Sequence, residues 1–399
     1  MQISMPANYD LELIPKLESY PVTEIYGKFP SDLVGGGRPS YMGTPLSRGE
    51  LQDYVSVAQD HGIAFNYLLN SSCLGNREWT GRWQKRLMRF LDRLREMGIS
   101  RLTVSTPYLL EAVKARRPDF YVKVGIFAQI DTPARARFWE ELGADELTLE
   151  SLTVNRDFDR LRAIRRAVSI PLQLIVNHVC MPNCPLQSYH QNGFAHASDN
   201  SDGLFIDYCL FRCSRRRLED PSLFIRSAWI RPEDLAVYER IGYGRFKLTE
   251  RGIPSEELLK RVRAYSERNF EGNLAELLLP YGFKKPIKKP RLWFLKHFFR
   301  PGAVWPWKLK PLLDLARQQG MMFPADERPV VIYSDRIPED FLEQVTKRDC
   351  TSVLCEECGY CHRVAERAVE IDPDFRSESR ERFREVESRL KEGELWNVQ

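Results

Sequence analysis

The chain has 399 residues, 43% of them hydrophobic and 29% charged, with a net charge of +4. This composition is that of a globular protein, and it excludes a wholly disordered, collagen-like or coiled-coil chain. No stretch approaches the ~20 consecutive apolar residues of a membrane helix. The N-terminus also lacks the basic start and apolar run of a secretory signal, so we expect a cytoplasmic protein.

Short apolar runs alternate with amphipathic stretches from Glu24 to Arg268. The predicted strands are Glu24–Phe29, Ile63–Leu69, Arg101–Ser105, Tyr121–Phe127, Glu146–Glu150, Leu172–Asn177, Phe224–Ile230 and Arg245–Thr249. The predicted helices are Arg82–Met97, Tyr108–Arg116, Thr132–Leu142, Asp157–Val168, Pro232–Ile241 and Ser255–Arg268. Regular alternation predicts a parallel sheet. Eight such units in about 250 residues favour a closed (β/α)8 TIM-like barrel over an open doubly wound sheet.

Two further segments are expected after the barrel. We predict a barrel over residues 1–275, a basic aromatic linker over 276–325 and a small cysteine-rich C-terminal domain over 326–399. Between Lys284 and Lys310 the linker carries nine Lys and Arg, no acid, and many aromatic residues. That mixture fits RNA binding, contact with an anionic membrane surface, or packing of the aromatics on the barrel. The charged segment Phe375–Trp396 is expected to be a helix with Glu–Arg/Lys pairs on its surface.

Eight of the nine cysteines fall into two groups of four. The first group is Cys180, Cys184, Cys209 and Cys213, and the second is Cys350, Cys355, Cys358 and Cys361. Because disulfides are rare in a reducing compartment, two such groups predict two metal or iron–sulfur sites.

The first cysteine group begins directly after the predicted strand Leu172–Asn177, at the end of a barrel where active sites lie. Its two C-x3-C pairs can each place two sulfurs on one face of a turn, as an iron–sulfur cluster or a tetrahedral Zn²⁺ requires. A structural zinc site therefore stays open beside a cluster.

The second cysteine group has the spacing C-x4-C-x2-C-x2-C. Tight runs of this kind wrap cubane clusters, whereas zinc sites more often separate two pairs by a dozen or more residues. We therefore predict a second 4Fe–4S cluster, with zinc as the alternative, and expect it to relay electrons to the barrel site.

Several motifs, in order, resemble peptidase family U-32, the collagenase-like group. They span about residues 22–275 and are GGGR at 35–38, NYLLNSSC at 66–73, NRDFDRL at 155–161, NHVCMPNCPLQSYH at 177–190, WIRPEDL at 229–235, FKLTERG at 246–252 and RNFEGNL at 268–274. The resemblance implies a barrel fold, and several members are implicated in oxygen-independent hydroxylation of tRNA, rRNA or ubiquinone precursors. It also implies that Cys180, Cys184, Cys209 and Cys213 hold a 4Fe–4S cluster, and prephenate is associated with the RNA hydroxylations.

Three residues are candidates for catalysis. Among the histidines near the first group (178, 190 and 196), His190 lies inside the family-like motif and can transfer protons. Arg38 follows three glycines, and an Arg fork beside free backbone N–H groups can bind an anionic group. Glu150 ends a predicted strand, so it is expected at the mouth of the barrel, as are Asn70, Asn155, Arg156 and Lys247.

Two other classes of function stay open. The family name implies a peptidase, but the chain contains no H-E-x-x-H and no G-x-S-x-G motif. A zinc-structured RNA-binding or assembly protein without catalysis is the second alternative. For a redox enzyme we expect an electron-donor protein as partner, possible RNA or anionic-membrane contact through Lys284–Lys310, and a possible homo- or hetero-oligomer.

Overall fold

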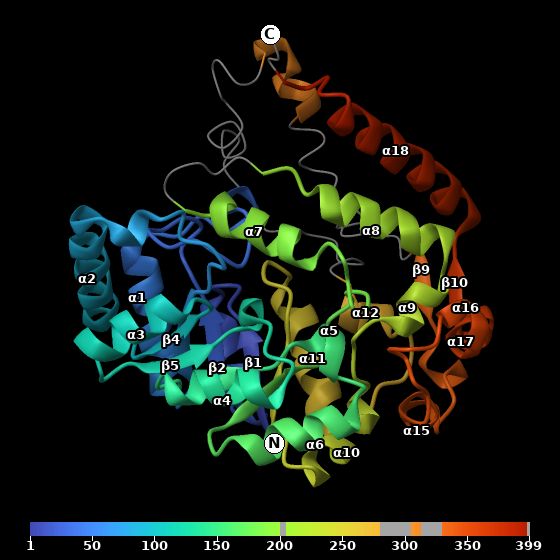
Figure 1. Ribbon diagram of the computed structural model, residues 1–399, viewed down its shortest axis with the longest axis horizontal. Coiled ribbons are helices and arrows are strands. Elements are labelled where there is room, and N and C mark those ends of the chain that lie inside the picture. Colours follow the sequence, from blue (N-terminus) through green and yellow to red (C-terminus); the bar gives the residue numbers. More distant parts are fainter. Residues whose placement is uncertain (200–204, 280–304, 313–328, 397–399) are drawn as a thin grey trace.

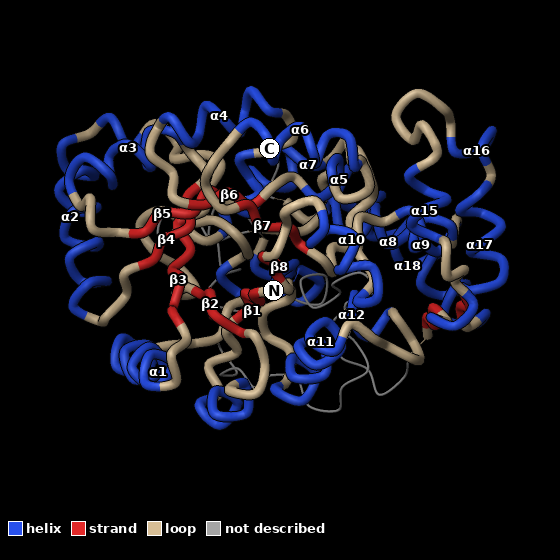
Figure 2. Tube along the Cα trace, turned by 90° about the horizontal axis from the view of Figure 1, so that it is seen from below, coloured by secondary structure: helices blue, strands red, loops and turns tan. Residues whose placement is uncertain are grey.

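Eight parallel strands close into a barrel in the computed structural model, which describes residues 1–199, 205–279, 305–312 and 329–396. The strands follow one another around the barrel in chain order (Figure 2). They are β1 (Gln2–Pro6), β2 (Val22–Gly27), β3 (Ala64–Leu69), β4 (Arg101–Val104), β5 (Tyr121–Val124), β6 (Glu146–Thr148), β7 (Leu172–Ile175) and β8 (Arg245–Lys247). The predicted TIM-like barrel is confirmed.

Helices cover the outside of the barrel. They are α1 (Arg48–Asp60), α2 (Gly81–Glu96), α3 (Pro107–Arg116), α4 (Pro133–Glu141), α5 (Ser151–Val154), α6 (Phe158–Ala167), α10 (Leu235–Arg240), α11 (Ser255–Glu267) and α12 (Ala275–Leu278). Helix α2 shows why they form: Thr80 caps its N-terminus, and Leu87, Leu91 and Leu94 recur on one face and are buried. Short 3-10 helices complete the loops: η1 (Leu11–Leu17), η2 (Ser40–Met42), η3 (Arg77–Trp79), η4 (Ile126–Ala128), η5 (Pro232–Asp234), η6 (Pro306–Lys308) and η7 (Ser334–Arg336).

One predicted strand is wrong and one real strand lies elsewhere. Phe224–Ile230 is not a strand: it holds most of the short helix α9 (Ser222–Arg226) and then a loop in which the Trp229 indole donates to the Phe224 carbonyl at 2.7 Å. A continuous apolar run does not distinguish a buried turn from a buried strand. The eighth strand is β1, which pairs with both β2 and β8 and so closes the barrel.

The connection from β7 to β8 is long and carries the first cysteine group. It contains α7 (Gln187–Ala197), α8 (Tyr208–Glu219) and α9, and Figure 1 shows α7 and α8 following one another across the same side of the molecule. The C-terminal end of α7 is tied to the β2 side of the rim, because Gly36 N donates to Ser198 Oγ at 2.8 Å. This connection therefore spans the mouth of the barrel.

The C-terminal segment packs on the barrel beside α8 and α9. It comprises the antiparallel pair β9 (Val330–Ile332) and β10 (Val369–Ile371) with helices α15 (Phe341–Thr346), α16 (Cys355–Cys358), α17 (Tyr360–Ala368) and α18 (Pro373–Lys391). Phe341 stacks on Trp229 with ring centroids 5.6 Å apart. Because buried residues of this segment join the same hydrophobic core as the barrel, it is not separately packed. The division at 275 and 325 stays a prediction, and the basic linker lies outside the described residues except for 305–312.

Helix α18 forms as predicted but uses its charges differently. Glu385 and Arg389 form the expected pair within the helix at 3.8 Å. Glu387 instead pairs with Arg215 of α8 at 2.8 Å, and Arg384 lies 3.7 Å from Glu219. The acidic and basic side chains therefore dock α18 onto α8. In the part of the chain that is described, no helix is long and apolar enough to cross a bilayer.

Candidate functional site

The first cysteine group gathers on the rim after β7. Cys180 and Cys184 lie in the loop that leaves the strand, and Cys209 and Cys213 lie one turn apart on α8. All four are free thiols. Interaction with Cys213 lowers the pKa of Cys184 to about 7, while burial and the charge of Cys213 raise the pKa of Cys180 to about 12. The two C-x3-C pairs, separated by 24 residues of sequence, are thus neighbours.

One buried cation faces these thiols. Arg217 lies one turn beyond Cys213 on α8, is 4% exposed, and donates to the Val179 carbonyl at 2.6 Å. Its charge opposes the rise in the pKa of both Cys180 and Cys213. Sequence reasoning missed Arg217, although its four-residue spacing from Cys213 placed it on the cysteine face of a helix.

The donor chemistry fits a thiolate-ligated centre, but the ligand geometry is not preformed. No group of three or more His, Cys, Asp or Glu in the described ranges has the arrangement of a metal site. Four thiols from two segments, with one buried guanidinium to balance thiolate charge, are nevertheless the donor set that an iron–sulfur cluster or Zn²⁺ requires.

His190 lies beside the first cysteine group and is held by a carboxylate. Its Nε2 is 2.9 Å from Asp207 Oδ1, and its ring packs on Phe194 at 4.3 Å. Burial lowers the pKa of His190, but the charge and hydrogen bond of Asp207 outweigh it and raise that pKa overall. Asp207 also caps α8 by accepting from Leu210 N at 2.9 Å. The sequence analysis did not identify Asp207, because an aspartate before a helix is ordinarily explained by capping alone.

Glu150 faces the same group from β6. It accepts a hydrogen bond from Leu152 N at 3.0 Å and another from Gln187 of α7. Burial raises the pKa of Glu150 to about 7, and its charge acts on Cys180. A carboxyl group with a pKa near neutrality can both accept and donate a proton.

Arg38 lies on the opposite, β2 side of the mouth and is already neutralised. Its guanidinium pairs with Glu250 and donates to the Arg251 carbonyl. Burial and the charge of Arg251 lower the pKa of Arg38 to about 9. The glycine run before it is equally engaged, since Gly35 N donates to Asp32 Oδ1 at 2.7 Å and Gly36 N to Ser198.

Hydrogen bonds join the β2 side of the rim to the end of α7, the helix that carries His190. Ser40 Oγ donates to the Ala197 carbonyl at 2.9 Å, and Gly36 N donates to Ser198 Oγ at 2.8 Å. Tyr41, next to Ser40, is 2% exposed, and burial raises its pKa.

The second cysteine group also gathers. Cys350 lies in a loop, Cys355 and Cys358 lie at the two ends of α16, and Cys361 lies in α17. Burial and the charges of Cys355 and Cys358 raise the pKa of Cys350, and burial raises that of Cys361 to about 11.

A buried arginine stands next to this second group. The Arg156 guanidinium lies 4.6 Å from the Trp229 ring centroid and donates to the Ile225 carbonyl at 2.8 Å. Its charge opposes the rise in the pKa of Cys361 and Cys350. The sequence placed Arg156 at the mouth of the barrel, whereas the structure places it against the second cysteine group.

A cleft of about 1200 Å³ lies between the two groups. Residues Met181, Pro182 and Asn183, in the loop between Cys180 and Cys184, line one side of it, and all four cysteines of the second group line another. The second cysteine group therefore opens into this cleft, whereas the four cysteines of the first group do not line it.

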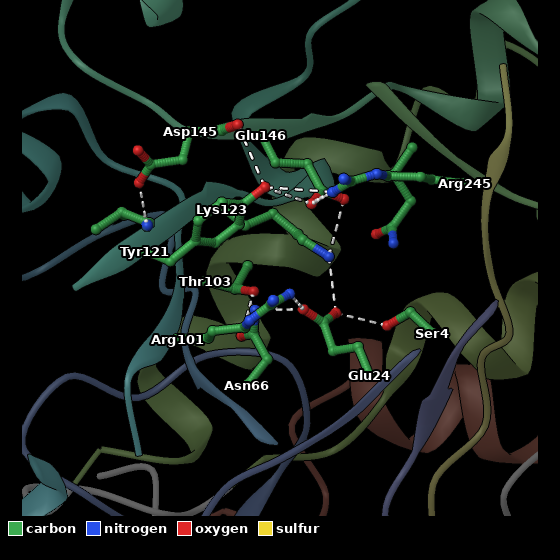
Figure 3. A network of polar contacts seen from close by, with 12 residues as sticks. Ser4, Glu24, Asn66, Arg101, Thr103, Tyr121, Lys123, Asp145, Glu146 and Arg245 are labelled. Carbon is green, nitrogen blue, oxygen red and sulfur yellow. Dashed lines mark hydrogen bonds and ion pairs between the residues drawn. The ribbon is translucent and has the colours of Figure 1, made fainter. Parts of the chain in front are cut away.

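The interior of the barrel holds a charged network that the sequence analysis did not identify (Figure 3). Lys123 Nζ lies 2.7 Å from Glu24 Oε1 and 3.0 Å from Glu146 Oε1, and all three side chains are buried. Ser4 and Asn66 also donate to Glu24, and Arg245 pairs with Glu146 at 2.5 Å. The sequence signal that could have indicated this network is the presence of charged residues within otherwise apolar predicted strands.

With the barrel and its cysteine-bearing rim defined, comparison with known proteins gives one curated relative. It is an uncharacterized protease of Methanocaldococcus jannaschii, 28% identical over 356 residues, which cover 89% of this chain and 90% of that protein. No family model matches the chain. Among solved structures, the U32 peptidase Mk0906 is 24% identical, with a TM-score of 0.48 over 64% of this chain and 94% of that one. A phosphoribosyl anthranilate isomerase of Thermus thermophilus is 11% identical, with a TM-score of 0.35 over 67% of this chain and 98% of its own. The resemblance to the U32 peptidases that the motifs predicted is confirmed.

Proposed function

We propose that this chain is an iron–sulfur redox enzyme of the U32 type. Its reaction would be an oxygen-independent hydroxylation, or a related modification, of an RNA, a quinone-like lipid or a small molecule. The observation that carries the proposal is the convergence of Cys180, Cys184, Cys209 and Cys213 on the rim of the barrel, next to Glu150 and His190.

The first cysteine group would hold a 4Fe–4S cluster through its four thiolates. When bound, such a cluster supplies one-electron transfer and can activate a substrate or an oxygen donor. Arg217 would balance part of the negative charge of the thiolates, which is the reason for a buried cation at that position.

The protein's own groups would move protons. His190, whose pKa Asp207 raises from 2.9 Å away, would act as a proton donor. Glu150, with a pKa of about 7, would accept or return a proton on the β6 side of the same site. Arg38, although paired with Glu250, would help to position an anionic group of the substrate on the β2 side of the mouth.

The second cysteine group would hold a second 4Fe–4S cluster, with zinc as the alternative. The second group opens into a cleft that is also lined by the loop between Cys180 and Cys184, which supports a role in passing electrons from a donor protein to the rim. Contact of Lys284–Lys310 with RNA or an anionic membrane, and assembly into a homo- or hetero-oligomer, are further parts of this proposal.

Anaerobic metal and sulfide analysis tests the proposal. The protein should be brown and contain about eight iron and eight sulfide per chain, or about four of each with one zinc. Replacing both Cys184 and Cys213 by Ser should remove about four iron, and replacing both Cys355 and Cys358 should remove the metal of the second group. Cys73→Ser is the matched control, because Cys73 belongs to neither group and its loss should leave the metal content unchanged. Colourless protein with two zinc per chain would refute the redox mechanism.

A peptidase is the second candidate, and one contact favours it. Ser151 Oγ lies 2.6 Å from His178 Nδ1, which is the contact of a serine nucleophile with its base. Within the described residues no carboxylate bonds to the His178 ring, and Ser151 is only 2% exposed. Peptide cleavage that survives loss of all eight grouped cysteines but disappears in Ser151→Ala would favour this candidate.

A further inference from the structure

Three cations line the mouth of the barrel, between the ends of β1, β2 and β8. Lys28, Arg38 and Arg251 border a small, partly open hollow of about 20 Å³, together with Tyr9 and Gly252. None of the cysteines borders this hollow.

The three cations differ in their partners. Lys28 Nζ pairs with Asp32 Oδ2 at 3.0 Å, and Arg38 pairs with Glu250. No hydrogen bond or ion pair joins the Arg251 guanidinium to any residue that the structure describes. Arg251 is therefore the one of the three that keeps its fork of N–H donors open to a ligand.

The polar groups around Arg251 are already engaged. Tyr9 Oη donates to the Lys28 carbonyl at 2.8 Å, Tyr26 Oη to the Leu248 carbonyl at 2.7 Å, and Tyr67 Oη to Asp32 at 2.9 Å. These tyrosines are the groups that act most on the pKa of Arg251, which burial lowers. None of them is an anion at neutral pH, so the charge of Arg251 stays uncompensated.

A fourth cation lies deeper on the same side. Lys247 Nζ sits 3.9 Å from the Tyr26 ring centroid, and Arg251 acts on it. Burial and the charge of Lys123 lower the pKa of Lys247 to about 7. Since Lys28 and Arg38 have carboxylate partners, Arg251 and the partly protonated Lys247 are the charges here that a bound anion would compensate.

The glycine run leaves room for this arginine. Gly37 has φ +79°, and a Cβ there would lie 3.0 Å from Arg251 Nη2 and 3.1 Å from Asn70 Oδ1. Asn70 Oδ1 is itself buried without a hydrogen-bond partner among the residues described. Both the conformation and the space at position 37 favour glycine.

We infer that Arg251, with Lys28 and Arg38 beside it, binds the carboxylate or phosphate group of a small molecule in this hollow. The open guanidinium would form the bidentate contact, while Lys28 and Arg38, each paired with a carboxylate, border the hollow beside it. This assigns to Arg251 the central anion contact that the sequence analysis gave to Arg38. Anion binding stands by itself; only the identification of the ligand as the enzyme's substrate or co-substrate rests on the proposed function.

Thermal unfolding of the full-length protein tests this site. Inorganic phosphate and malonate are the two probes, with chloride at the same ionic strength as the reference, and the iron content of each preparation is measured. Wild-type protein should show a higher Tm in phosphate or malonate than in chloride. Which of the two stabilises more distinguishes a phosphate ligand from a carboxylate ligand.

Arg251→Gln should weaken binding of the better probe at least tenfold. In chloride this variant should unfold at the same temperature as wild type or a higher one, because it removes an uncompensated buried charge. Arg166→Gln is the matched control, since Arg166 is an exposed arginine at the end of α6, and it should bind the probe like wild type.

Two results would overturn the inference: equal stabilisation of Arg251→Gln and wild type by the better probe, or no stabilisation of wild type by either probe. If Arg251→Gln does not fold, Arg251→Lys replaces it, and probe binding as tight as that of wild type would contradict a bidentate contact. The Tm measurement does not need a bound cluster. Preparations that lack iron yet bind the probe would therefore refute the proposed redox function and leave the anion site intact.

Discussion

At the scale of single residues, the interior of the barrel depends on Lys123. This lysine lies between Glu24 and Glu146, and all three side chains are withdrawn from water. Buried ion pairs add little net stability compared with apolar residues, but removing one partner leaves an uncompensated charge.

Lys123→Met should therefore destabilise the protein by about 3–5 kcal/mol. The measurement is the free energy of unfolding in urea at neutral pH. Lys347→Met is the control, because Lys347 and Glu343 form an exposed pair at 2.5 Å whose loss should be barely measurable. If both substitutions changed the free energy of unfolding equally, Lys123 would not be essential to the stability of the barrel interior.

Glu24 gives this network a pH dependence. Burial alone would raise the pKa of Glu24, but the charge of Lys123 and hydrogen bonds from Lys123 and Ser4 lower it from 4.5 to about 2. A carboxyl whose pKa is depressed by folding contributes stability above its unfolded pKa and loses it as the pH falls towards the folded value.

The stability of the wild-type protein should thus fall between about pH 5 and pH 2. In Glu24→Gln this fall should be shallower, and the urea midpoint at pH 7 should be lower than in wild type. Parallel pH profiles of the two proteins between pH 5 and pH 3 would show that Glu24 is not responsible.

The candidate site was only partly predictable at this scale. Cysteine spacing identified the two groups, and the family-like motif identified His190. Asp207, Arg217 and Arg251 were missed, because their roles depend on neighbours brought from other elements. Arg38 was predicted as an open anion contact, but Glu250, distant in sequence, occupies it.

At the scale of elements, the connection between β7 and β8 and the helix α18 depend on one another. Glu387 is 3% exposed and bonds to both Arg212 and Arg215 of α8, the helix that carries Cys209 and Cys213. Arg376 also donates to the Leu218 carbonyl at 2.6 Å. Docking of α18 therefore holds one half of the first cysteine group in position.

Glu387→Gln should loosen α18 from α8 and cost about 1–2 kcal/mol of stability, since Arg212 remains partly exposed to water. Hydrogen exchange should become faster in both helices. Glu385→Gln changes a charge on the same helix that contacts only Arg389, so exchange in α8 should not respond. Unchanged exchange in α8 for both variants would contradict the coupling.

Element prediction succeeded where periodicity was strong and failed where it was weak. Five of the six predicted helices form within one residue of their expected ends, because each has a regular buried face. In the sixth, Pro232–Ile241, the first three residues form the 3-10 helix η5 and α10 begins only at Leu235. The five-residue strand β1 was missed, and Phe224–Ile230 took its place in the count of eight. Strand β1, which ends at Pro6, and the buried segment Phe224–Ile230 are both too short to show a hydrophobic period that separates a strand from a loop.

At the scale of the whole molecule, the protein combines a barrel rim, a long β7–β8 connection and a C-terminal segment around one cleft. The second cysteine group and the loop between Cys180 and Cys184 line this cleft, and the cation-bearing hollow is a separate opening at the ends of β1, β2 and β8. The barrel could be predicted from the alternation of strands and helices along the chain. That the rim, the β7–β8 connection and the C-terminal segment meet could not, because their contacts depend on tertiary packing.

The central claim is that the first cysteine group holds a redox-active cluster at the rim. Anaerobic titration with dithionite, followed by absorption near ~400 nm, tests it most directly. Wild-type protein and Cys73→Ser should both bleach on reduction, and replacement of Cys184 and Cys213 together should remove about half of the change. The account would be contradicted by wild-type protein with no reducible chromophore, or by full bleaching in that double variant.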